Sequence, residues 1–161
     1  MADHILEFRL WLPRPRPEVF AFFADPANLA AVTPRWLGFT LLTPLPIQFQ
    51  AGTVIDCRIR WLGLPLSWRS MIREYDPPYR FVDVQLWGPY ARWEHRHFFL
   101  EGAPDGHGAT PMGTWVEDRV TYQLPLGRLG RWVHALLVRR QLEAIFAYRK
   151  DRLLERFGGR E

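Results

Sequence analysis

The sequence predicts an α+β domain: a seven-stranded antiparallel sheet wrapped around a long C-terminal helix, with two short helices after the first strand. Three observations predict this class. Apolar and polar residues alternate along several stretches, as they do in strands with one buried face. Helical segments that begin with proline interrupt this pattern near the N-terminus, and a long stretch without proline ends the chain.

The N-terminal part predicts a strand, two short helices and then the body of the sheet. Residues 4–12 alternate as a half-buried strand, and the prolines and Glu18 of residues 14–18 stop it and start a helix. Asp25 has the side chain of a helix cap and begins a second short helix, which Thr33-Pro34 closes. Residues 36–42 lead into the sheet, which alternating stretches continue at residues 53–61, 68–74, 81–87, 91–101 and 113–124.

A long helix is expected over residues 129–157, which contain no proline and no glycine between Gly130 and Gly158. Its apolar face changes direction along the way by about a quarter turn, at 100° per residue. The change falls at Arg139-Arg140, which predicts curvature, a kink, or an arginine that faces inward. The two groups of apolar residues are Leu129, Val133, Leu136 and Leu137, then Leu142, Phe146, Leu153 and Phe157.

Composition and charge exclude several classes of protein. The 48% apolar and 15% aromatic content, with eight tryptophans, indicates that a large apolar site is being lined. The net charge of +4 comes from basic residues scattered among acids, so we expect no nucleic-acid partner. No segment approaches the roughly 18 apolar residues of a membrane span, so we expect no integral membrane association.

The usage of rare residues suggests an origin and a location. Cys57 is the only cysteine, so no intramolecular disulfide can form and the cytoplasm is the expected location. Lys150 is the only lysine and Asn28 the only asparagine, a bias that suggests a GC-rich genome. The scarcity of thermolabile residues indicates a thermophile.

The order of one strand, two short helices, six strands and a long helix resembles the START-like, or SRPBCC, superfamily of the helix-grip fold. This superfamily includes the major birch pollen allergen, lipid-transfer START domains and bacterial polyketide cyclases. Residues 93–98 and 118–122 look like the bacterial ligand-binding members, some of which are fused to sugar-epimerase-like domains. The resemblance covers a single domain over residues 1–161 and carries over no catalytic motif. The other stretches that carry it are residues 17–29, Thr33 to Leu37, Pro77-Pro78 with Phe81, and Gly127 through the terminal helix.

Strand periodicity gathers polar side chains on one face of the predicted sheet. Successive side chains of a strand alternate between its two faces, so Trp93, His95, His97 and Phe99 share one face. The same parity groups Phe81 with Asp83 and Gln85, and Val116 with Asp118, Val120 and Tyr122. If these faces turn inward, the cavity holds two histidines, two aspartates, a glutamine and a tyrosine in an apolar wall.

This cluster has three interpretations, because buried polar groups must find partners. Asp118 could hold a histidine and Asp83 a backbone group or an arginine, which would only stabilise the sheet. The cluster could instead orient the polar end of a ligand while tryptophans enclose its body. In the third interpretation His95 or His97, paired with Asp118, acts as a general base with Tyr122 as hydrogen-bond donor, as a cyclase, dehydratase or isomerase needs.

Metal and thiol chemistry are less well supported. Two histidines separated by one residue on a strand project to one side, as metal ligands do, but Asp83 or Asp118 would have to complete the set. The resemblance implies no metal, and we expect neither a metal nor another cofactor. Cys57 occupies an apolar strand position, where a buried and unreactive thiol is expected.

These observations favour a protein that binds a small hydrophobic or amphipathic molecule, a lipid or a polyketide-like aromatic, between sheet and helix. An enzyme of the kind described above and a protein-interaction module with a filled cavity are the alternatives, and a protein partner stays open. Trp36 and Leu37 are expected at the cavity mouth, opposite the turn at residues 63–66. The expected ligand contacts are Trp36, Phe39, Trp61, Trp68, Asp83, Gln85, Trp93, His95, His97, Asp118, Tyr122 and Phe146.

Overall fold

The computed structural model describes residues 3–61, 63–105, 112–125 and 137–159. Seven strands form one antiparallel sheet in the order β1-β7-β6-β5-β4-β3-β2, which confirms the predicted architecture. β4 begins four residues before the predicted range, and β2 has only two residues. The strands are β1 (His4–Leu12), β2 (Thr40–Leu41), β3 (Val54–Trp61), β4 (Leu64–Asp76), β5 (Arg80–Trp87), β6 (Arg92–Gly102) and β7 (Gly113–Gln123).

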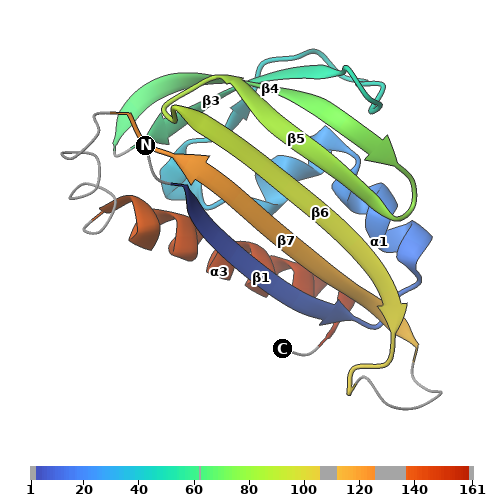
Figure 1. The fold of residues 1–161 in the computed structure, drawn as a ribbon. Coiled ribbons are helices and arrows are strands. Elements are labelled where there is room, and N and C mark those ends of the chain that lie inside the picture. Colours follow the sequence, from blue (N-terminus) through green and yellow to red (C-terminus); the bar gives the residue numbers. More distant parts are fainter. Residues whose placement is uncertain (1–2, 62, 106–111, 126–136, 160–161) are drawn as a thin grey trace.

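The helices cover the concave face of this curved sheet. α3 (Arg139–Phe157) runs beneath β1 and β7, while α1 (Arg16–Phe23) and the 3-10 helices η1 (Pro26–Val32) and η2 (Arg35–Leu37) cover the other part (Figure 1). The register of β4 against β5 shifts twice, and such irregularities increase the local bend and twist of a sheet. A bent sheet can close around a helix from three sides.

The short helices begin as their sequences predict. Pro17 occupies the first turn of α1, where its missing N–H costs no hydrogen bond. Asp25 caps η1, since its Oδ1 accepts a hydrogen bond from the Ala27 N–H at 3.0 Å. These two signals place η1 directly over the inner face of the sheet.

The start of the long helix falls outside the described residues, and so do the expected contributions of Leu129, Val133 and Leu136. Leu137 and Val138 belong to a π-helical turn directly before α3, at the place where an irregularity was predicted. Arg139 and Arg140 are both exposed, and Arg139 donates a hydrogen bond to Glu143 at 2.8 Å. The arginine that faces inward is Arg149, ten positions after Arg139.

The apolar core has two halves. One half surrounds α1 and the C-terminal end of α3, with Phe20, Phe99 and Phe157 among its members. The other half surrounds the start of α3, with Tyr122 and Phe146 among its members. The predicted site lies between them. In the described part of the chain, no helix is both long and apolar enough to span a membrane.

Candidate functional site

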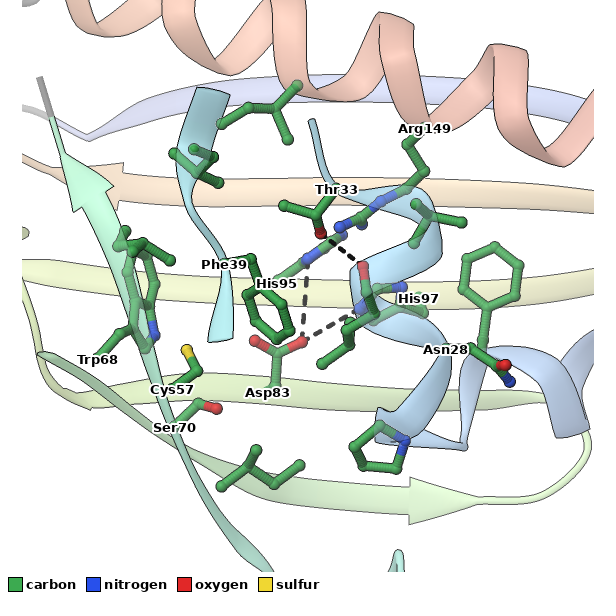
Figure 2. Close-up of a pocket in the computed structure, with 18 of the residues that line it drawn as sticks. Asn28, Thr33, Phe39, Cys57, Trp68, Ser70, Asp83, His95, His97 and Arg149 are labelled. Atoms are coloured by element: carbon green, nitrogen blue, oxygen red, sulfur yellow. Dashed lines mark hydrogen bonds and ion pairs between the residues drawn. The ribbon is translucent and has the colours of Figure 1, made fainter. Parts of the chain in front are cut away.

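A cavity of about 210 Å³ lies between the sheet, η1 and α3. Apolar side chains supply most of its wall, and a few polar groups gather at one place within it (Figure 2). A concave, mainly apolar space with few polar groups is the usual form of a small-molecule site. The apolar and aromatic part of the wall includes Phe22, Phe23, Leu29, Val32, Leu37, Phe39, Phe49, Ile55, Ile59, Trp61, Trp68, Ile72, Phe81, Tyr90, Trp93, Leu142, Ile145 and Phe146.

The polar groups are two histidines held between two aspartates. β6 places His95 and His97 on its inner face, where Asp83 of β5 is opposite His95 and Asp118 of β7 is opposite His97. Asp118 Oδ1 lies 3.0 Å from His95 Nε2 and 2.8 Å from His97 Nδ1. Asp83 Oδ1 lies 3.1 Å from His97 Nε2 and 3.9 Å from His95 Nδ1. Each imidazole therefore lies between the two carboxylates.

Aromatic rings hold this cluster in position. The imidazole centroids of His95 and His97 are 3.7 Å apart, and the ring of Phe81 stacks on His97 at 4.2 Å. Phe146 of α3 meets His95 edge-on at 5.6 Å. Rings packed this closely restrict each other's rotamers, so the imidazole nitrogens have fixed directions.

The charges of the cluster are mutually dependent. Burial alone would raise the pKa of Asp118, but the two imidazoles outweigh it and hold that pKa well below its usual value. Burial would lower the pKa of His97, and the charge and hydrogen bond of Asp118 raise it overall. The pKa of His95 is lowered by burial and by the neighbouring charge of His97. The opposite directions of the two pKa shifts favour the proton on His97 and a neutral His95.

A fifth ionisable group, Arg149 of α3, lies beside the cluster. Its side chain extends from the helix into the cavity toward His95 and Thr33 (Figure 2). Its Nε is buried, and among the described residues no hydrogen bond or ion pair reaches its guanidinium. Burial lowers the pKa of Arg149, while the charges of Asp118 and Asp83 raise it from a longer distance. The sequence analysis did not include Arg149 among the site residues.

A second cavity of about 330 Å³ lies on the other side of these α3 residues, between β1 and α3. Asp118 lines this second cavity, whereas Asp83, His95 and His97 line the first. Phe146 and Arg149 line both. The polar cluster is thus reached from two sides.

Of the expected ligand contacts, eight line the first cavity and four do not. The eight are Phe39, Trp61, Trp68, Asp83, Trp93, His95, His97 and Phe146. Trp36 is 51% exposed outside the wall, although its neighbour Leu37 lines the cavity. Asp118 lines the second cavity instead. The remaining two, Gln85 and Tyr122, are engaged elsewhere.

Gln85 and Tyr122 take part in packing near the cavity. The Gln85 side chain donates to the Tyr90 carbonyl at 2.8 Å and accepts from the Tyr90 N–H, which ties the turn between β5 and β6. Tyr122 is fully buried against Tyr90 and Trp93, and burial raises the pKa of its phenol to about 12. Residues of the cavity wall that were not expected include Arg149, Asn28 and Thr33.

Three of these side chains could approach a metal ion. Asp83, His95 and His97 each offer one ligand atom, and the three atoms lie within 4.8 Å of one another. A divalent ion there would have to displace the proton of His97 and lie near the positive charge of Arg149. The donor set is therefore suitable in type but already neutralised by its neighbours.

Comparison with known proteins finds the fold but no close relative. No family model matches the sequence, and no curated protein matches it. Among solved structures, Ara h 8.0201 matches with a TM-score of 0.57 and 15% identity, over 96% of this chain and 99% of its own. A protein from Chromobacterium violaceum matches with a TM-score of 0.68 and 12% identity, over 98% and 99% of the two chains. The chain has the START-like helix-grip fold.

One further match concerns a multidomain protein. The nucleoside-diphosphate sugar epimerase from Corynebacterium glutamicum is 24% identical, with a TM-score of 0.61. The alignment covers 93% of this helix-grip domain but only 28% of that chain. The likeness therefore concerns one part of the epimerase protein, and at this identity it shows the fold alone.

Proposed function

We propose that this helix-grip domain binds one small hydrophobic or amphipathic molecule, a lipid or a polyketide-like aromatic, in the cavity between sheet and α3. The observation that carries the proposal is the cavity itself, with about 210 Å³ of space, an apolar wall and its polar groups gathered beside α3. A core that served only stability would fill such a space, because protein interiors are close-packed. The same argument disfavours an interaction module with a filled cavity.

The outer surface supports a small-molecule partner more than a polyanion. Many basic side chains outside the cavity are paired with acids, as Arg69 is with Asp56 at 2.7 Å and Arg73 is with Glu94 at 2.8 Å. Such pairs weaken the positive field that a nucleic acid would need. We therefore include no nucleic acid in the proposal, and it contains no cofactor. The expected location is the cytoplasm, because Cys57 is the only cysteine.

The first test is native mass spectrometry of the protein purified from its own host, followed by denaturation and identification of any released molecule. One apolar molecule per chain is the expected result. A panel of lipids and aromatic metabolites, screened by thermal shift, provides a second route to the ligand, since a ligand at 100 times its Kd stabilises by about 2.7 kcal/mol. Consistent absence of a bound molecule, together with no stabilisation by any compound, would refute the proposal.

The second candidate is proton transfer on the bound molecule, and the position of His95 favours it. This imidazole lines the cavity, is neutral because its pKa is lowered by burial, and is oriented through its Nε2 by Asp118. It could accept a proton from a carbon next to a carbonyl. The test is the exchange of ligand C–H for deuterium in D₂O, which His95→Gln should abolish while ligand binding persists.

A further inference from the structure

Arg149 is a half-buried cation whose Nε is fully buried and has no close partner among the described residues. Within the described ranges no carboxylate forms an ion pair with its guanidinium, and the buried Nε has no hydrogen-bond acceptor. The guanidinium carbon of Arg149 lies 5.2 Å from the ring centroid of Phe146. A buried donor without an acceptor costs free energy, about 1–3 kcal/mol and more for a charged group.

The two nearby carboxylates are already occupied. Asp118 is within 3.0 Å of both imidazoles, and Asp83 accepts a hydrogen bond from His97 at 3.1 Å. With His97 positive and His95 neutral, the four groups carry two negative charges and one positive charge. The charge of Arg149 balances this sum, but its side chain extends into the cavity, and no acceptor among the described residues meets its buried Nε.

We propose that Arg149 binds an anionic group of the ligand, so that the cavity takes a hydrophobic molecule ending in a carboxylate, sulfonate, phosphate or enolate. The apolar wall formed by Trp68, Trp93 and the neighbouring side chains would enclose the body of that molecule. Guanidinium groups suit planar anions because they donate two parallel hydrogen bonds. This inference rests on the proposed function and narrows its ligand to hydrophobic acids.

The anion also explains why the imidazole pair is useful beside the arginine. Addition of one negative charge to a neutral buried cluster is unfavourable unless a proton follows it. His95 is positioned to take such a proton, because it lies between Asp118 at 3.0 Å and Asp83 at 3.9 Å.

The test compares two fluorescent probes that share one skeleton, 1-anilinonaphthalene-8-sulfonate and the neutral N-phenyl-1-naphthylamine. We expect wild-type protein to bind the sulfonate at least about tenfold more tightly, the factor that one charge-assisted hydrogen bond supplies. Arg149→Met should remove this preference and leave the Kd of the neutral probe unchanged. Arg149→Lys, which keeps the charge, should retain most of it.

Exposed arginines also attract sulfonates, so Arg140→Met serves as the matched control on the same helix. Arg140 is exposed and lies outside both cavities, and its variant should bind both probes as wild type does. Decanoic acid and decanol provide a second matched pair, as competitors that displace the neutral probe from the same site. The acid should compete at least about tenfold better than the alcohol in wild type, but equally well in Arg149→Met.

The outcomes distinguish failure of the anion site at Arg149 from failure of the proposed hydrophobic binding site. If both probes bind with equal affinity in wild type and Arg149→Met changes neither, the anion site is refuted and the hydrophobic binding site stands. If neither probe binds and neither competitor has an effect, the proposed function itself fails. A poorly folded Arg149→Met leaves the inference testable, because decanoic acid and decanol compete for the site of the neutral probe in wild type, and Arg149→Lys keeps the charge.

Discussion

Replacement of Asp118 by asparagine should destabilise the protein more than any exposed charge replacement on the same strand. Asp118 Oδ1 lies 3.0 Å from His95 Nε2 and 2.8 Å from His97 Nδ1, in a buried position. The amide of Asp118→Asn can still accept one hydrogen bond, but it cannot balance the charge of His97. Removal of one partner from a buried charged pair costs about 3–5 kcal/mol, and the retained hydrogen bond places this variant at the low end, about 3 kcal/mol.

For a chain of this length, ~3 kcal/mol lowers the melting temperature by roughly 6–12 °C. The assay is thermal unfolding at pH 6 followed by circular dichroism, with urea unfolding as an independent measure. The matched control is Glu117→Gln, one position away on β7, where Glu117 pairs with Arg9 at 2.9 Å on the exposed surface. Exposed pairs contribute at most about 1 kcal/mol, so this control should lose no more than a few degrees.

The difference between wild type and Asp118→Asn also depends on pH with a definite sign. The pKa of His97 is raised in the folded protein, so its stabilising effect is complete below the unfolded value of 6.5 and is lost as the pH rises through the folded pKa. The pKa of Asp118 is lowered, so its effect is lost only in strong acid. The difference in melting temperature between wild type and Asp118→Asn should therefore become smaller from pH 6 to pH 9. A constant difference, or a loss no larger than that of Glu117→Gln, would refute the coupled charges.

The remaining predictions concern the wall, the thiol, metals and heat. Phe146→Ala should cost about 3–5 kcal/mol, because Phe146 is buried and stacks on Phe8 with centroids 4.0 Å apart; a urea-unfolding loss below 1 kcal/mol would contradict that packing. Burial, aided by the charge of Asp56, raises the pKa of the Cys57 thiol to about 12, so iodoacetamide at pH 8 should modify the native protein roughly a thousandfold more slowly than the unfolded one, and equal rates would disprove the burial. Zn²⁺ at pH 7 should leave the melting temperature unchanged; a rise that His95→Ala abolishes would instead reveal a metal site. The scarcity of thermolabile residues, with Asn28 the only asparagine and Cys57 the only cysteine, predicts a melting temperature above the 45–65 °C typical of mesophilic domains, and a value inside that range would overturn the thermophile hypothesis.

The sequence predicts the architecture well because alternation and turn residues act locally. Parity along one strand is sufficient to place His95 with His97, and the structure confirms the further condition that the faces of Asp83 and Asp118 turn the same way. Parity cannot say which aspartate meets which histidine, because that depends on the register between strands. Nor does it predict how Gln85 is used, since its partner is the backbone of Tyr90 in the following turn.

The inward arginine was expected near Arg139 and is found at Arg149 for a reason that the sequence contains. Arg149 follows Phe146 by three residues and precedes Leu153 by four, so all three lie on one face of the helix. The change of the apolar face at Arg139-Arg140 coincides with the π-helical turn at Leu137 and Val138, and it does not mark the inward arginine. A charged residue inside an established apolar stripe is the better signal, because burying it without a purpose is unfavourable.

Phe146 and Arg149 form the common wall of the two cavities, and both belong to a single turn of α3. Side chains of the helix therefore separate the two cavities, while the sheet supplies the two imidazoles. A smaller residue at position 146 would join the first and second cavities without a change in any strand. Related proteins with this fold could accept longer ligands through that one substitution and keep an arginine at position 149 for the proposed anionic group.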